Sequence, residues 1–182
     1  MKKLIVCVVA AAFLLTGCQK DYIKEGTGLL EGQKYSEAVK SFEKAVDEKQ
    51  DVAEGLRGLG MAYYEQKEYQ KAKDAFLEVL DKGGRKTPAL YNLIGVCSMR
   101  LDDAQAALDA FQKGIALASA GIGRASEAGK EDGALQEMRY NEIVCYEKLL
   151  DWESAKAKAQ DYVSLYPDDK EAQKEAAFLR TR

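Results

Sequence analysis

Two stretches of the chain, Lys34-Tyr35-Ser36-Glu37-Ala38 and Glu68-Tyr69-Gln70-Lys71-Ala72, share one pattern at an offset of 34 residues. Each is followed, at the same distances, by a phenylalanine and a smaller apolar residue: Phe42 with Ala45, and Phe76 with Val79. A third copy contains Ala104, Ala107, Phe111 and Gly114, and a fourth contains Trp152, Ala155, Ala159 and Tyr162, with Pro167 after it. A repeat of this length predicts stacked helical units that bury their apolar faces against one another.

Each copy has the apolar spacing of an amphipathic helix. In the first copy one stripe follows the 3.6-residue period of an α-helix: Tyr35, Ala38, Val39, Phe42, Ala45 and Val46. A second stripe precedes the copies, formed by Leu56, Leu59, Gly60 and Tyr63 in the second unit and by Tyr91, Ile94, Gly95 and Ser98 in the third. Each unit is therefore expected to be a pair of helices.

These residues resemble the tetratricopeptide repeat, and the second unit matches its pattern most fully. The resemblance implies an all-α, right-handed superhelical solenoid of antiparallel helix pairs, with about four repeats and a C-terminal capping helix. A generic helical bundle is the alternative. We expect repeats at about 19–52, 53–87, 88–121 and 136–169, an insertion at about 119–133, and a capping helix at about 168–180.

Three positions depart from the repeat pattern. Glu25 stands where leucine is usual and Leu29 where tyrosine is usual, so the first helix is expected to pack less tightly. Ile143 replaces the glycine that the other units have at this position. The insertion before the fourth unit predicts a loop or a lengthened helix pair, because its glycines disfavour a helix interior.

The composition excludes several functions. The chain has 182 residues and no histidine, which removes histidine-based nucleophile activation and mixed Cys/His metal sites. With 27 Lys+Arg against 30 Asp+Glu, it has no basic excess for a nucleic-acid backbone. We expect no cofactor, no metal site and no nucleic-acid partner.

The first residues have the order of a secretion signal: Lys2 and Lys3, the apolar run 4–15, then Thr16-Gly17-Cys18. Leu15-Thr16-Gly17-Cys18 resembles the lipobox of bacterial lipoproteins, which implies removal of residues 1–17 and a diacylglycerol on Cys18. The mature domain would be 18–182, lipid-anchored on the extracytoplasmic side of a bacterial cell membrane or outer membrane. An ordinary signal peptide with a chance cysteine is the alternative.

Other candidate sites have structural interpretations. Cys97 and Cys145 occupy equivalent positions in neighbouring first helices, whose usual separation exceeds the reach of a disulfide, so free buried thiols are expected and a disulfide is the less favoured alternative. The Asp102-Asp103 and Asp168-Asp169 pairs are expected to cap helices. An enzyme using Glu65 and Glu147 is the least favoured interpretation, since two acids on a solvated face are usually only charge.

The resemblance also implies where a partner binds. In tetratricopeptide arrays the ligand usually lies along the first helices, and counting along the repeats gives this groove set: Arg57, Met61, Tyr64, Asn92, Val96, Met99, Arg100, Tyr140 and Lys148. Ile23 and Thr27 stand where chaperone-binding repeats need lysine and asparagine, so a chaperone C-terminus is not expected. Burial of the groove by the superhelix itself is the alternative.

We therefore expect a non-enzymatic adaptor, anchored by lipid, that binds another envelope protein or a peptide segment of one. The alternative is a binding protein for a peptide or small ligand that feeds a transporter or sensor. Self-association stays open but is not indicated by the sequence.

Overall fold

The computed structural model describes residues 20–121 and 133–182, and all regular structure in these ranges is helical. The helices are α1 (Tyr22–Glu31), α2 (Tyr35–Asp47), α3 (Val52–Glu65), α4 (Tyr69–Asp81), α5 (Pro88–Arg100), α6 (Ala104–Ser119), α7 (Gly133–Lys148), α8 (Trp152–Leu165) and α9 (Lys170–Leu179).

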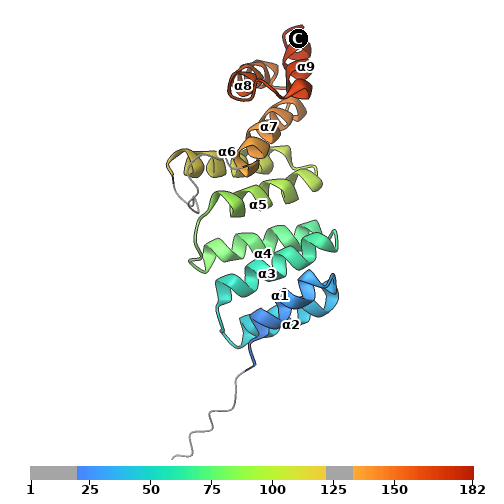
Figure 1. Ribbon diagram of the computed structural model, residues 1–182, viewed down its shortest axis with the longest axis vertical. Coiled ribbons are helices and arrows are strands. Elements are labelled where there is room, and N and C mark those ends of the chain that lie inside the picture. The colour runs from blue at the N-terminus through green and yellow to red at the C-terminus, as the bar shows by residue number, and fades with distance from the viewer. Residues whose placement is uncertain (1–19, 122–132) are drawn as a thin grey trace, which may run out of the picture.

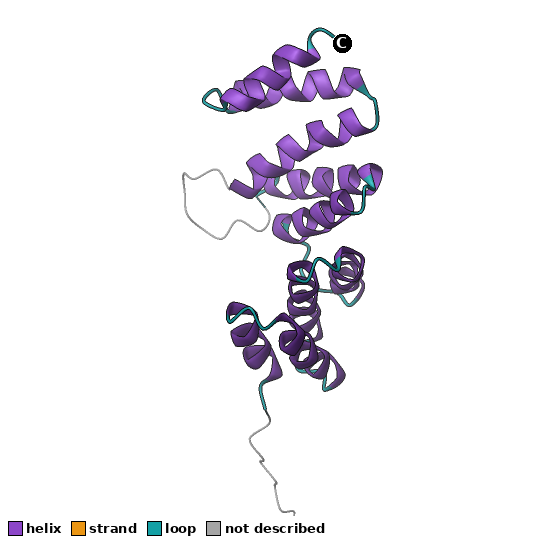
Figure 2. Cartoon of the chain, turned by 90° about the vertical axis from the view of Figure 1, so that its right-hand side faces the viewer, coloured by secondary structure: helices purple, strands orange, loops and turns teal. Residues whose placement is uncertain are grey.

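The helices stack along the long axis of the molecule, so α1 and α9 lie at opposite ends (Figure 1). Successive helices pack as antiparallel pairs joined by short turns, which the second view shows for each pair (Figure 2). The first helices of neighbouring units also touch, α1 against α3 and α5 against α7. The expected all-α helical-repeat solenoid is confirmed.

One turn geometry joins the two helices of every pair. Four residues adopt left-handed φ angles near 60° there: Gln33, Lys67, Asp102 and Leu150. In the last of these turns the Asp151 amide donates to the Tyr146 carbonyl at 2.9 Å, and the equivalent bond recurs in the other three turns. This pattern is a Schellman motif, which satisfies the final carbonyls of the first helix and reverses the chain.

Aspartates cap several helices. Asp103 accepts a hydrogen bond from the Ala106 amide at 3.0 Å, and Asp169 accepts one from the Ala172 amide at 3.0 Å, as their position in the sequence predicts. Asp102 does not cap; it occupies the turn. Lys34 and Glu68, at the positions equivalent to Asp103, make no side-chain cap bond.

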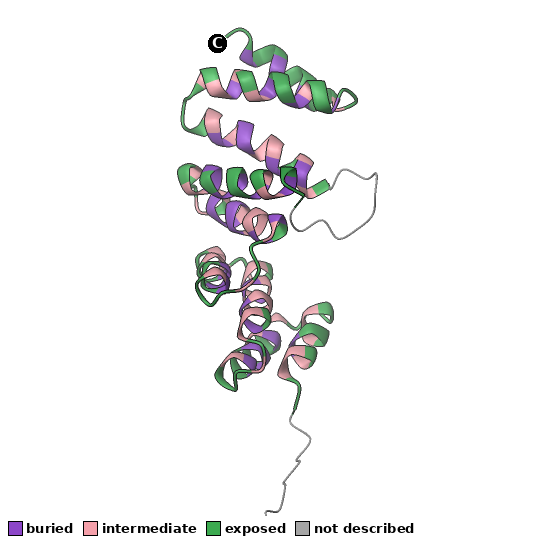
Figure 3. Cartoon of the chain, turned by 90° about the vertical axis from the view of Figure 1, so that its left-hand side faces the viewer, coloured by how far each residue is buried: buried purple, intermediate pink, exposed green. Residues whose placement is uncertain are grey.

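Glycines and phenylalanines set the spacing within the first three units. A Cβ at Gly60 would lie 2.5 Å from Phe76 Cε1, and a Cβ at Gly95 would lie 2.5 Å from Phe111 Cε1. Both rings are fully buried. Buried segments occur on helices all along the stack (Figure 3). Only glycine lets the helices approach this closely.

The fourth unit reverses this arrangement. Ile143 stands at the glycine position, and Ala159 stands at the phenylalanine position of α8. The two residues belong to one buried cluster and are each 2% exposed. The departure of Ile143 from the repeat pattern is therefore matched by a compensating small residue on the facing helix.

The capping segment covers the end of the array. Helix α9 buries Ala172, Ala176 and Leu179 in the same cluster as Ile143 and the inner face of α8. Its other face carries mostly charged residues. The last repeat thus has an apolar side covered and a polar side presented outward, as solenoid ends require.

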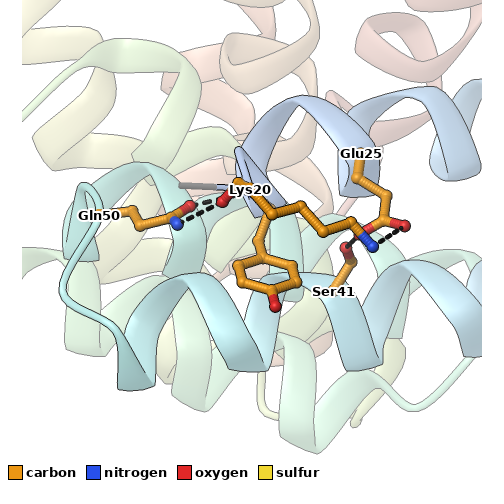
Figure 4. A network of polar contacts seen from close by, with 5 residues as sticks. Lys20, Glu25, Ser41 and Gln50 are labelled. Carbon is orange, nitrogen blue, oxygen red and sulfur yellow. Dashed lines mark hydrogen bonds and ion pairs between the residues drawn. The ribbon is translucent and has the colours of Figure 1, made fainter. Parts of the chain in front are cut away.

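The first helix is held by polar contacts around Glu25 (Figure 4). Glu25 forms an ion pair with Lys20 at 2.8 Å and accepts a hydrogen bond from the Ser41 hydroxyl at 2.8 Å. The Gln50 side chain donates to the Lys20 carbonyl at 2.6 Å and accepts from the Tyr22 amide at 2.9 Å. The unusual glutamate is therefore accommodated by a polar network that ties α1 to α2 and to the α2–α3 connection.

Three sequence-based expectations fall outside the described residues. They concern the signal peptide 1–17, lipidation of Cys18, and the part of the insertion from 122 to 132. Within 20–121 and 133–182, no helix has the length and apolar content needed to cross a bilayer.

Candidate protein-binding surface

The first helices of units two to four carry the whole groove set. Three of its residues lie on α3, four on α5, and Tyr140 and Lys148 on α7. We call the side of the molecule formed by α1, α3, α5 and α7 the first-helix face. Most of the groove residues there are half-buried, whereas Arg100 and Lys148 are exposed.

On α3 the apolar members lie partly against the core. Met61 and Tyr64 both pack on the buried cluster that contains Leu56 and Phe76. The Tyr64 ring meets the Tyr69 ring edge to face, with centroids 5.6 Å apart. These side chains therefore keep part of their surface open while their position is fixed by packing.

The two arginines differ in their freedom. Arg57 forms an ion pair with Glu54 one turn earlier on the same helix. Arg100 is the exposed last residue of α5, and among the described residues it has no ion-pair partner. Its guanidinium is thus available to a carboxylate or to a carbonyl group of another chain.

Further along α5, Asn92 reaches the next unit. Its side-chain amide donates to Glu137 of α7 at 3.1 Å, while its carbonyl oxygen is buried without a partner among the described residues. Val96 and Met99 pack on the buried cluster around Phe111 and Met138. This part of the face is therefore a contact between units as well as a candidate binding surface.

Lys148 at the end of α7 pairs with Asp102 in the α5–α6 turn. The hydrogen bond from Lys148 holds the pKa of the Asp102 carboxyl below its ordinary value. Because both side chains are substantially exposed, this pair contributes little to stability. It can be exchanged for a contact with a partner.

Tyr140 is the one groove residue that lines a described cavity, which lies where α7, α8 and α9 meet and has a volume of about 430 Å³. The sequence interpretation missed its other principal lining residues, Gln136, Tyr162 and Asp169. Gln136 donates to the Tyr162 hydroxyl at 3.0 Å, and that hydroxyl donates to Asp169 at 2.9 Å. Tyr140 and Tyr162 are visible in the sequence, but their spacing is also that of residues packed in the core, so it does not indicate a cavity.

The two described cysteines lie in the core and not on this surface. Cys97 and Cys145 are free and fully buried, as the helix spacing predicts. Burial raises the pKa of each thiol to about 11, which suppresses the reactive thiolate. Among the residues that the structure describes, no cluster of three or more potential ligands could hold a metal ion.

Two models of the tetratricopeptide repeat family match the chain, one over residues 23–89 and the other over residues 137–169. Together they cover more than half of its length. The chain belongs to the tetratricopeptide repeat family, a family of protein-interaction scaffolds. Comparison with curated proteins finds no significant match.

Solved structures share the same fold at low sequence identity. YrrB, a tetratricopeptide repeat protein described as having an unusual peptide-binding site, is 19% identical with a TM-score of 0.71, over 88% of this chain and 75% of YrrB. MamA from Desulfovibrio magneticus RS-1 is 18% identical with a TM-score of 0.70, over 88% of this chain and 82% of MamA. A tetratricopeptide repeat protein from Parabacteroides merdae is 16% identical with a TM-score of 0.63, over 87% of this chain and 56% of that protein.

Proposed function

We propose that this protein is a non-enzymatic adaptor, anchored by lipid at the outer face of a bacterial membrane, that binds a segment of another envelope protein on its first-helix face. The observation that carries the proposal is the mixture of side chains on that face. Half-buried apolar groups such as Met61 and Tyr64 on α3 and Met99 on α5 occur on this face together with the exposed cation of Arg100.

Such a mixture suits an extended or helical protein segment. Fixed aromatic and methionine side chains contribute apolar contact area at little entropic cost, and a neighbouring arginine can bond a carbonyl or carboxylate. The weak Lys148–Asp102 pair at the far end adds groups that can exchange partners. A peptide-binding site described for the structurally similar YrrB agrees with this use of the fold.

Site-specific crosslinking tests the binding surface. The photoreactive residue p-benzoylphenylalanine would replace Tyr64 or Arg100 in the full-length chain, and Lys113, which is exposed on the second helix α6, would be the matched control. We expect one protein to crosslink from both first-helix positions and not from the control position.

An Arg100→Glu change should weaken that crosslink at the Tyr64 position, because it reverses the exposed charge without disturbing a buried contact. Equal crosslinking from Lys113, or unchanged crosslinking in the Arg100→Glu variant, would contradict the assignment of the surface.

The lipid anchor is proposed from the sequence Leu15-Thr16-Gly17-Cys18. Only the three residues 19–21 separate Cys18 from the start of α1, so a lipid there would hold the folded array close to the bilayer. Metabolic labelling with an alkyne fatty acid should mark the parent chain and not a Cys18→Ser variant. A labelled variant, or an unlabelled parent, would refute the anchor.

A further inference from the structure

The cavity at the C-terminal end of the array differs in character from the rest of the first-helix face. Its aromatic lining is the half-buried Tyr140, whose ring meets the Tyr162 ring edge to face with centroids 5.6 Å apart, while Tyr162 itself is only 3% exposed. Its rim carries Glu137, Asp169 and Glu171 from two helices. Aromatic walls with carboxylates at the rim form an environment that favours an organic cation with an apolar stem.

Some of these carboxylates have partners within the chain. Asp169 caps α9 and accepts the Tyr162 hydroxyl, and Glu137 accepts the Asn92 amide. Glu171 pairs with Lys174 on its own helix, but both side chains are more than 70% exposed. An exposed pair of this kind is easily exchanged for another cation.

Two further carboxyl groups do not line the cavity but lie close enough to Tyr140 to raise the pKa of its hydroxyl. Glu147 on α7 and Glu175 on α9 have no ion pair within residues 20–121 and 133–182, and Glu147 Oε1 is buried without a hydrogen-bond partner there. Burial, and then the neighbouring Glu175 carboxyl, raise the pKa of Glu147 to about 7. Two acids facing each other in this way need a proton or a cation to relieve their repulsion.

The same groups surround Tyr140. Besides burial, the negative charges of Glu175, Glu147, Asp169 and Glu171 all raise the pKa of its hydroxyl. The negative potential of α7 and α9 therefore converges on the aromatic wall of the cavity. A cation placed against the Tyr140 ring would interact with all four carboxylates.

We propose that the cavity between α7, α8 and α9 binds a lysine or arginine side chain of the partner segment. This inference rests on the proposed adaptor function, and it names the kind of side chain that the C-terminal end of the array recognises. The aliphatic stem lies along the open part of the Tyr140 ring, and the charged head group reaches the Glu137 and Glu171 carboxylates that line the cavity. Since no described cluster has the ligands for a metal ion, an organic cation is the occupant that fits.

Fluorine NMR on the full chain in nonionic detergent, labelled with 3-fluorotyrosine, tests the cavity directly. The probes are the peptides acetyl-Gly-Lys-Gly-amide and acetyl-Gly-Arg-Gly-amide, with acetyl-Gly-norleucine-Gly-amide as the neutral match. We expect at least one cationic peptide to shift the Tyr140 and Tyr162 signals in a saturable way, and the norleucine peptide to leave them unchanged.

Two variants separate charge recognition from folding. Glu175→Gln keeps the shape of α9 and should weaken binding of the cationic peptide at least threefold. Asp47→Asn, an exposed acid at the other end of the array, should leave the affinity unchanged. In the parent chain the affinity should rise between pH 6 and pH 8, as Glu147 loses its proton, and this rise should be absent in Glu147→Gln.

Saturable shifts with norleucine equal to those with lysine would overturn the inference, as would an unchanged affinity in Glu175→Gln or the absence of any shift up to the solubility of both cationic peptides. The outcome is independent of the crosslinking test, because Tyr64 and Arg100 lie on α3 and α5. Failure of the cavity with intact crosslinks would refute only the cation site. Failure of the crosslinks would instead refute the adaptor surface.

Discussion

At the scale of single residues, the contact between the two helices of a unit is decided by one large and one small side chain. Units one to three place glycine on the first helix and phenylalanine on the second, whereas unit four places Ile143 on the first and Ala159 on the second. The total volume is conserved while the shape is reversed.

This exchange makes the two residues of unit four energetically dependent on each other. Ala159→Phe should overpack the interface and cost about 3 kcal/mol, and Ile143→Gly should leave a cavity and cost about 4 kcal/mol. In the double variant the ring can fill the space vacated by isoleucine, so its loss should be smaller than the sum by about 2 kcal/mol. Urea denaturation of the four proteins measures this coupling, and strict additivity would contradict the shared volume.

A second prediction at this scale concerns Glu147, whose pKa in the folded chain is raised from 4.5 to about 7. The folded state then binds the proton more tightly than the unfolded state does, so stability falls as the pH rises from about 4.5 to about 7. Glu147→Gln removes this dependence. Thermal midpoints of the parent should therefore fall relative to those of the variant across this range, and parallel curves would contradict the buried acid.

At the scale of the helices, the repeated turn places a residue in the left-handed region whatever its identity. Leu150 has φ 59° and is 68% exposed, so its side chain contributes little packing to offset the backbone strain. Gly83 holds the corresponding place at the end of α4, with φ 78° and open space around its Cα.

Opposite substitutions at these two turns should have opposite effects. Leu150→Gly should raise the free energy of unfolding by roughly 0.5–1 kcal/mol, because it relieves the left-handed strain. Gly83→Ala should lower it by about 1 kcal/mol for the same reason, since no contact is lost or made. Chemical denaturation monitored by circular dichroism compares the two with the parent.

Much of the helical framework could be predicted from the sequence, because it depends on local signals. The apolar stripes and the glycine–phenylalanine pairs such as Gly60 with Phe76 recur at a fixed interval, and Asp103 is a cap residue directly before a helix. The C-terminal cavity could not be predicted in this way. Its residues come from α7, α8 and the start of α9, and the fourth unit is displaced from the regular interval by the insertion, so no spacing links Tyr140 to Asp169 or Glu171.

The network at Glu25 was missed for a related reason. The sequence marks Glu25 as a departure from the pattern but does not reveal its partners. Lys20, Ser41 and Gln50 meet only after two helices and their connections have folded. Side-chain hydrogen bonds between residues about 30 positions apart, such as Gln50 with Lys20, leave no periodic trace in the sequence.

At the scale of the whole molecule, contacts run almost entirely between neighbouring helices, so stability is distributed unit by unit. The apolar cluster of unit four and α9 contains no residue from units one and two. A destabilising substitution at the C-terminal end should therefore loosen only that end of the array.

Leu179→Ala tests this independence. The side chain is fully buried beneath α9, so its truncation should cost about 2–4 kcal/mol and loosen the cap. Hydrogen–deuterium exchange should accelerate in α7, α8 and α9 and stay unchanged in α1 to α4. Faster exchange throughout the chain would instead indicate one cooperative unit.

The two hydrogen bonds of the Gln50 side chain, to the Lys20 carbonyl and from the Tyr22 amide, affect how the protein responds to force at its N-terminal end. A force applied to the N-terminal segment would act first on these two hydrogen bonds. They would transmit the force to the connection between α2 and α3, and not to the end of α1. The first helix is then sheared against its neighbours as a block instead of being peeled away turn by turn. Resistance to force at the N-terminal end of the array is thus set by one glutamine that lies 30 residues along the chain from Lys20.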